Sequence, residues 1–175
     1  MLIRWKCFNT YLLVALAMAG LCGCSSAEHK RKKQVSTLEL HMQVRADPSE
    51  RSTEAKILRD HPITFTIEKA PFLTEAYVKS AKVVDVTGGF ELRIEFDQHG
   101  TWLLEQVTAE NVGRHIAVLS QFGDKMKETR WLAAPMIHRR IADGVLTFTP
   151  DATREEAEEI ALGLNNLAKK VHQLD

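Results

Sequence analysis

The stretch VVDVTGGFELRIEFD, residues 83–97, decides the fold. In its second half, residues 90–97, apolar side chains alternate strictly with charged ones, and a period of two indicates a strand with one buried face. Gly88 and Gly89 come before this strand, and two glycines supply positive φ at little steric cost. Together with the apolar run 83–86 before the glycines, the stretch therefore predicts an antiparallel hairpin.

Four further segments carry strand patterns. Residues 37–45 alternate between apolar and polar side chains, which predicts a strand with one buried face. Residues 63–67 alternate and are rich in β-branched side chains. Residues 115–122 and 145–149 also predict strands. The segment 46–60 is charged and contains a proline, so we expect it to be mostly loop.

Three segments predict helices. Residues 74–81 place apolar side chains on one face of a short helix, and residues 100–112 form a second helix with Gly113 as its stop signal. In the last helix, Thr153 and Glu156 have the spacing of a capping box. The apolar residues that follow at helical spacing are Ala157, Ile160, Ala161, Leu164, Leu167 and Val171. Hairpins interleaved with about three helices predict an α+β fold with a mainly antiparallel sheet, on which the C-terminal helix packs.

The N-terminus has the pattern of a secretory signal. Arg4 and Lys6 form a positive start, residues 11–21 are apolar and uncharged, and small residues follow. The apolar run is shorter than the roughly 20 residues that span a bilayer. This length favours a cleaved signal peptide, residues 1–23, over an uncleaved membrane anchor.

The sequence LCGC, residues 21–24, resembles the lipobox of bacterial lipoproteins. The resemblance implies that Cys24 becomes the first residue of the mature chain and carries a lipid that anchors it to a membrane, facing the periplasm. Ser25 follows it, and in that family a residue other than aspartate favours the outer membrane over the inner one. Residues 24–36 are polar and predict a tether. Its basic residues 30–33 suit either a solvated spacer or attraction to anionic headgroups, worth about 1 kcal/mol per basic residue.

Composition limits what the mature chain can do. All three cysteines lie at or before Cys24, so the rest of the chain has no thiol for a disulfide, a metal or a nucleophile. Removing the signal with its Arg4 and Lys6 leaves 21 basic residues against 23 acidic ones. That balance excludes the footprint of a nucleic-acid-binding protein. About 150 mature residues suit one domain, which we place at residues 37–175.

No motif in the sequence predicts catalysis, a metal site or a cofactor. The histidines are scattered without zinc spacing, and no GxGxxG, GK[ST] or GxSxG sequence is present. The cluster His138-Arg139-Arg140 suits either a solvated strand edge or an anion site, and Trp102 and Trp131 suit either packing or a ligand platform. We therefore expect a protein that is not an enzyme and has no small-molecule substrate. The alternative is an enzyme with an unrecognised site.

Residues 70–172 resemble the head of the first periplasmic domain of SecD, a translocase-associated export factor. The matching segments are, in order, Leu73-Thr74, Ala81-Lys82-Val83, Ile94-Glu95-Phe96 with Gly100, Leu104 and Thr108, Asn111-Val112-Gly113-Arg114, Ile116-Ala117-Val118, Ala134-Pro135-Met136-Ile137 with Ile141 and Gly144, and Thr149 with Glu155-Glu156-Ala157 and Leu164. The chain departs from the family at residues 146–148, which read LTF in place of Gly-x-Phe. The charged segment 123–130 is also longer than its counterpart.

The resemblance implies a weak hold on extended polypeptide. An edge strand offers backbone hydrogen bonds whatever the side chains of its partner, and proline is tolerated on edges but not in central strands. The candidate edge is therefore the segment around Pro135, with Trp131, Ile137 and Ile141 as further contacts. The leading hypothesis is a lipid-anchored envelope protein that binds unfolded polypeptide or another envelope protein in connection with protein export. The alternative is a structural or assembly lipoprotein that uses the domain as a scaffold.

Overall fold

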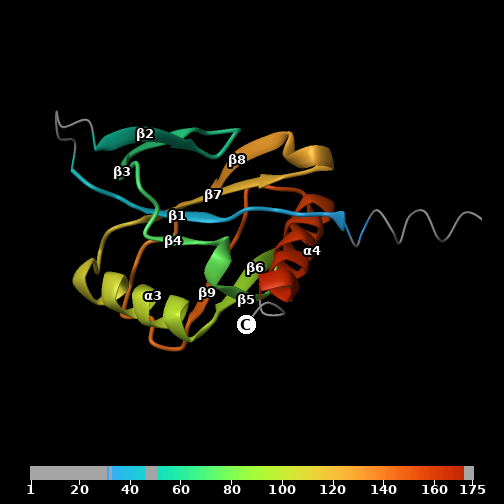
Figure 1. Ribbon diagram of the computed structural model, residues 1–175. Coiled ribbons are helices and arrows are strands. Elements are labelled where there is room, and N and C mark those ends of the chain that lie inside the picture. The colour runs from blue at the N-terminus through green and yellow to red at the C-terminus, as the bar shows by residue number, and fades with distance from the viewer. Residues whose placement is uncertain (1–30, 32, 46–50, 172–175) are drawn as a thin grey trace, which may run out of the picture. The chain divides into compact units, whose positions relative to one another are not determined.

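The computed structural model describes residues 31, 33–45 and 51–171 (Figure 1). The predicted signal peptide and Cys24 lie outside these residues. By its internal contacts the chain divides into two units, Met1–Lys33 and Gln34–Asp175. The second unit carries all the elements below. It begins at Gln34, whereas the sequence placed the start of the domain at residue 37.

All strand pairs in the described residues are antiparallel. A four-stranded sheet has the order β4-β1-β7-β8, a three-stranded sheet has the order β5-β6-β9, and β2 and β3 form a separate hairpin. The strands are β1 (Glu39–Met42), β2 (Ser52–Ile57), β3 (Ile63–Glu68), β4 (Leu73–Thr74), β5 (Val78–Val86), β6 (Gly89–Phe96), β7 (Ile116–Phe122), β8 (Glu128–Ala133) and β9 (Val145–Phe148). The mainly antiparallel architecture that the sequence predicts is confirmed.

The hairpin predicted from residues 83–97 is confirmed as β5 and β6. Gly88 has φ of +90° and lies in the turn, while Gly89 is the first residue of β6 and pairs with Val86. Leu92 and Ile94 are fully buried, and Phe96 is 3% exposed. These three side chains belong to the main apolar core, which also contains residues of both larger sheets and of the helices.

The two α-helices of the described residues begin with side-chain caps. In α3 (Gln98–Glu110) the carboxylate of Asp97 accepts from the amide of Gly100 over 2.7 Å. In α4 (Arg154–Val171) the predicted capping box is present: Thr153 Oγ1 accepts from the amide of Glu156 over 3.2 Å, and the Glu156 carboxylate accepts from the amide of Thr153 over 2.8 Å. Arg130 donates twice to the same carboxylate, at 2.8 and 3.0 Å, and lowers the pKa of Glu156.

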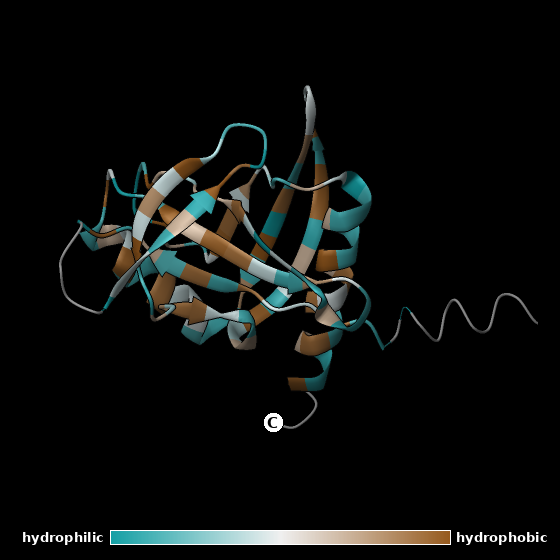
Figure 2. Ribbon diagram, turned by 90° about the horizontal axis from the view of Figure 1, so that it is seen from above, coloured by the Kyte–Doolittle hydropathy of each residue, from teal (hydrophilic) through white to brown (hydrophobic). Residues whose placement is uncertain are grey.

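The prediction of a short helix over residues 74–81 is wrong, so the described residues hold two α-helices instead of about three. A 3₁₀ turn, η1 (Glu75–Tyr77), leads directly into β5. Helical spacing of apolar residues is overridden here because the segment pairs with β6 and is held by α4. The Asn165 side chain accepts from the Ala81 amide over 2.9 Å and donates to its carbonyl over 2.7 Å. The outer edge of β5 is therefore covered by α4, which packs on this strand (Figure 2).

The prediction of loop over residues 46–60 is wrong for residues 52–57, which form β2. This strand pairs with β3 along its whole length, and Ala55 and Ile57 are buried against Ile67 and Ala117. The β2–β3 hairpin also covers the second face of β1. His41 is consequently 4% exposed, and its Nδ1 lies 2.9 Å from the carbonyl oxygen of Glu68. The predicted strand 37–45 exists in its central part, but it is buried on both faces.

Residues 34–36 pack against α4. Asn166 donates to the carbonyl of Gln34 over 3.0 Å, and Gln34 also donates to Glu159. Ser36 is fully buried against Gly163, where a Cβ would lie 2.5 Å from the Ser36 nitrogen and 2.2 Å from its hydroxyl. A glycine in the middle of a helix normally lowers stability. Here the missing side chain of Gly163 leaves room for Ser36, so residues 34–36 can pack directly against α4.

We expect Gly163→Ala to destabilise the domain by about 1–3 kcal/mol. Helix propensity alone would favour alanine by about 1 kcal/mol, so the sign of the effect separates close packing from propensity. Urea unfolding of the chain from Gln34 onward measures it. Adding Ser36→Gly to Gly163→Ala removes the hydroxyl and Cβ from the contact and should restore part of the loss. Stabilisation by Gly163→Ala alone would contradict the packing described here.

Candidate functional site

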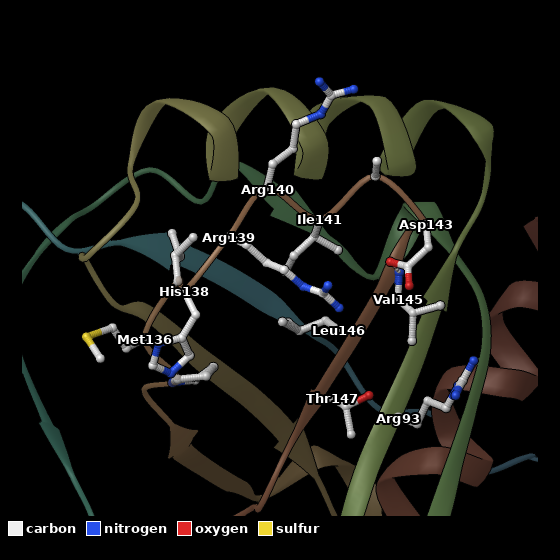
Figure 3. A pocket seen from close by; sticks show the side chains of 13 residues that line it. Arg93, Met136, His138, Arg139, Arg140, Ile141, Asp143, Val145, Leu146 and Thr147 are labelled. Carbon is white, nitrogen blue, oxygen red and sulfur yellow. Dashed lines mark hydrogen bonds between the residues drawn. The ribbon is translucent and has the colours of Figure 1, made fainter.

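A hollow of about 560 Å³ lies between β9 and the segment that precedes it (Figure 3). The chain runs from residue 135 to residue 143 along one wall, turns at Gly144 with φ of +67°, and returns as β9 along the other. Arg93 on β6 lies beside β9 and completes the lining. The lining residues are Arg93, Pro135, Met136, Ile137, His138, Arg139, Arg140, Ile141, Ala142, Asp143, Val145, Leu146 and Thr147.

One wall of the hollow is a strand edge without a neighbouring strand. β9 ends the order β5-β6-β9, and the amide of Phe96 donates to the carbonyl of Gly144 over 2.9 Å. Backbone groups alternate sides along an antiparallel strand, so those of Val145 and Thr147 point away from β6. The Val145 amide donates to Asp143 Oδ1 over 3.2 Å. An added strand could therefore form hydrogen bonds with three backbone groups on this edge: the amide and carbonyl of Thr147 and the carbonyl of Val145.

The other wall is fixed to the start of β7. The amide of Ile116 donates to the carbonyl of Pro135 over 3.0 Å, and the amide of Ile137 donates to the carbonyl of Arg114 over 2.8 Å. These bonds flank the isolated bridge between His115 and Met136. The same alternation turns the backbone groups of Met136 away from β7. The segment is thus a short edge of its own, and it lines the hollow opposite β9.

The hollow is lined by more positive than negative charge. Arg93, Arg139 and Arg140 lie around it, and Asp143 is the lone carboxylate of the lining. Arg140 forms an ion pair with Glu105 of α3. Within the described residues no ion pair forms at Arg93 or Arg139. Figure 3 shows the Arg139 side chain reaching into the hollow, while that of Arg140 points toward α3.

Glu91 and Glu95 lie on the outer face of β6, each two positions from Arg93, and neither lines the hollow. Glu95 is held by β5. Its carboxylate accepts from Lys79 over 3.3 Å and from the Ser80 hydroxyl over 3.1 Å. The bonds to Lys79 and Ser80 lower the pKa of Glu95, with a smaller contribution from the charge of Arg93. This carboxylate is therefore already engaged by β5, and Arg93 forms no ion pair with it.

Three of the four residues predicted as a polypeptide-contact edge lie together at this site. Pro135, Ile137 and Ile141 line the hollow, although Ile137 itself is buried. Trp131 lies elsewhere, in β8, with its ring edge-on to that of His41 at 5.4 Å. The sequence reading did not include the open edge at Thr147, because only sheet order shows that β9 has no outer neighbour.

The described part of the chain contains no group of His, Cys, Asp or Glu side chains placed to hold a metal ion. Within the same residues, no helix has the length and apolar character needed to cross a bilayer. The described residues thus form two antiparallel sheets, a hairpin and two helices around one main core, with a hollow beside the open edge of β9. The class is an α+β domain with antiparallel sheets and a C-terminal helix.

The family follows from comparison with known proteins. The sequence model of the SecDF P1 head subdomain matches residues 50–168, more than half of the chain. This chain belongs to the SecDF P1 head subdomain family. The match begins before the range that the sequence resemblance covered, and it includes β2 and β3.

Individual relatives agree with this assignment. The protein translocase subunit SecD of Calditerrivibrio nitroreducens is 30% identical over 105 residues, which are 58% of this chain and 19% of that protein. The chain thus spans about a fifth of the length of this curated relative. One solved structure, described as a membrane component SecDF that enhances protein export, has a TM-score of 0.55 at 21% identity, covering 81% of this chain and 67% of that one.

A second solved structure, SecDF in a super-membrane-facing form, has the same TM-score of 0.55 and the same identity of 21%. It covers 78% of this chain and 20% of its own. At this level of identity both structures show a shared fold. The resemblance to the SecD head that the sequence showed is therefore confirmed by the family match, and the two solved structures share the fold.

Proposed function

We propose that this chain is a non-enzymatic, lipid-anchored envelope protein whose P1 head domain binds extended polypeptide at the β9 edge, in connection with protein export. The observation that carries the proposal is the open edge at Thr147, which faces a hollow with a second short edge on the opposite wall. An extended segment that enters the hollow can pair with β9 through its backbone. The relationship to SecD and SecDF supports the link to export.

The anchor is the second part of the proposal. It rests on residues 21–24, whose pattern resembles a lipobox. The lipid on Cys24 holds the chain to a membrane facing the periplasm, and Ser25 favours the outer membrane. Residues beyond Cys24 link the anchor to the compact unit that begins at Gln34.

Binding at the edge should be weak. Ordering a flexible chain offsets much of the contact energy, so we expect dissociation constants of about micromolar or above. Backbone hydrogen bonds do not depend on the side chains of the bound segment. Weak binding of this kind suits a protein that binds many different unfolded segments. The hydrogen bonds come from the backbone, and the walls of the hollow add contacts from Pro135 and Ile141.

The experiment that tests the edge replaces Thr147. Thr147→Pro removes the amide that faces the hollow, and it leaves the bonds to β6 because those come from the neighbouring residues. We expect it to weaken binding of an unfolded, fluorescently labelled peptide to the full-length protein by about tenfold. Thr147→Val is the matched control, since it removes the hydroxyl but keeps the amide and should bind normally.

Both variants must retain the circular dichroism spectrum and melting temperature of the parent to within a few degrees. Equal binding by Thr147→Pro and Thr147→Val would remove the edge from the proposal. Failure of the parent protein to bind any unfolded peptide at high micromolar concentration would favour the alternative, in which the domain is a scaffold for envelope assembly.

A further inference from the structure

We infer that the β9 edge binds polypeptide segments that carry acidic side chains in preference to neutral or basic ones. This inference rests on the proposed function and names the class of client for the same site. The total charge of the chain is near neutral and predicts no electrostatic preference. The residues that line the hollow, in contrast, carry more positive than negative charge. Charge close to a binding site affects which ligands bind there more than the total charge of the protein does.

Two arginines that line the hollow form no ion pair within the described residues. Arg93 belongs to β6, and Arg139 belongs to the opposite wall. Arg140 is paired with Glu105, and the Asp143 carboxylate accepts from the Val145 amide. Among the residues that line the hollow, the charge that no ion pair of the described residues engages is therefore positive, on β6 and on the opposite wall.

The register places Arg93 beside the open edge. Arg93 and Thr147 are direct cross-strand partners in a pair without mutual hydrogen bonds, the arrangement in which side chains approach most closely. On its other side Arg93 faces Lys82 of β5, also as a direct partner. Like charges directly opposite each other destabilise a sheet. A negative side chain near Arg93 relieves that repulsion.

A strand added to β9 points alternate side chains toward the outer face of the three-stranded sheet, where Arg93 lies. A glutamate or aspartate at such a position lies between Arg93 and Arg139. Arginine donates to carboxylates through a planar fork of two N–H groups, which suits this task better than a lysine ammonium. Basic segments meet repulsion at the same positions.

The test compares capped peptides of one length and one β-prone sequence that carry two glutamates, two glutamines or two lysines. At low salt the full-length protein should bind the glutamate peptide about fivefold more tightly than the glutamine peptide, and the lysine peptide more weakly than either. The preference should shrink as ionic strength rises to about 0.15 M. Arg139→Gln and Arg93→Gln should each remove about half of this preference or more.

Arg51→Gln is the matched control, because it makes the same charge change at an exposed residue before β2, and it should keep the full preference. Equal affinity for the glutamate and glutamine peptides would overturn the inference, and so would a preference that survives in both hollow variants. The edge proposal would stand in either case if the glutamine peptide still binds and Thr147→Pro still weakens that binding.

A separate experiment measures binding of the protein and of Arg139→Gln to phosphatidylglycerol vesicles. Arg139-dependent vesicle binding without a preference among the peptides would assign the charge to a lipid surface and overturn the client class.

Discussion

Phe96→Ala is expected to destabilise the domain by about 3–5 kcal/mol, which is of the order of the whole stability of a domain this size. Phe96 is 3% exposed and ends β6 at the point where the chain turns into α3. A Cβ on Gly100 would lie 3.0 Å from the Cβ of Phe96, which shows that α3 and the end of β6 are in close contact there. The surrounding backbone has little room to collapse into the space that the ring leaves. The loss therefore includes both the transfer energy and an unfilled cavity.

The control for this prediction is Phe90→Ala in the same strand. Phe90 lies on the same face of β6 but is only partly buried, near the guanidinium of Arg154. Its loss should be clearly smaller, because the ring of Phe90 is only partly buried and less apolar area is removed from water there. Urea unfolding of the chain from Gln34 onward gives both values, and the unsubstituted fragment should unfold in one cooperative step. Equal costs at Phe90 and Phe96 would show that the core is arranged differently.

Cys24→Ser is expected to abolish labelling of the protein by a fatty-acid probe in cells. A serine hydroxyl does not provide the thiol to which the lipid is attached, and the rest of the mature chain has no cysteine. The protein should then accumulate as an uncleaved precursor or in the soluble fraction. Fluorescence of the incorporated probe after gel separation measures the effect.

Cys22→Ser is the matched control for the anchor. It removes a cysteine two residues earlier, at a position where serine is common in lipoboxes, so labelling and fractionation should stay unchanged. Labelling that persists in Cys24→Ser would refute the lipid assignment. Labelling lost equally in both variants would mean that the loss in Cys24→Ser does not identify the lipidated residue.

The parts of the fold that sequence predicted were those determined by local patterns. The alternation in residues 90–97 determines a strand whatever its neighbours are, and the Thr153–Glu156 capping box defines a helix start within one turn. Gly113, with φ of +85°, likewise follows the end of α3 as predicted. In each case the physical cause lies within a few residues of the effect.

The wrong predictions share a different cause. Residues 78–81 have helical spacing but are extended, because β6 and the side chain of Asn165 bind their backbone from far along the chain. Residues 52–57 are polar and charged, yet they form β2 because β3 offers a complete ladder. Tertiary pairing outweighed local preference in both segments.

The candidate site divides along the same line. Pro135, Ile137 and Ile141 could be proposed from a proline in an apolar run, and the structure brings them to one hollow. The open edge at Thr147 and the unpaired Arg93 depend on sheet order and cross-strand register. A sequence pattern shows neither sheet order nor register. The open edge and the role of Arg93 could therefore be identified only from the three-dimensional structure.

The place of β1 in the four-stranded sheet has a consequence for how the domain forms. β1 is the first strand along the chain, yet it lies between β4 and β7, with Leu40 opposite Val118. Loop closure over such a separation costs entropy before any contact compensates for it, and folds rich in distant pairings form slowly. A chain that emerges N-terminus first exposes β1 well before β7 exists. The β5–β6 hairpin can close at once from its own turn, whereas β1 must wait for β7. Nascent copies of this domain therefore pass through a period in which the edge of β1 that will pair with β7 is open.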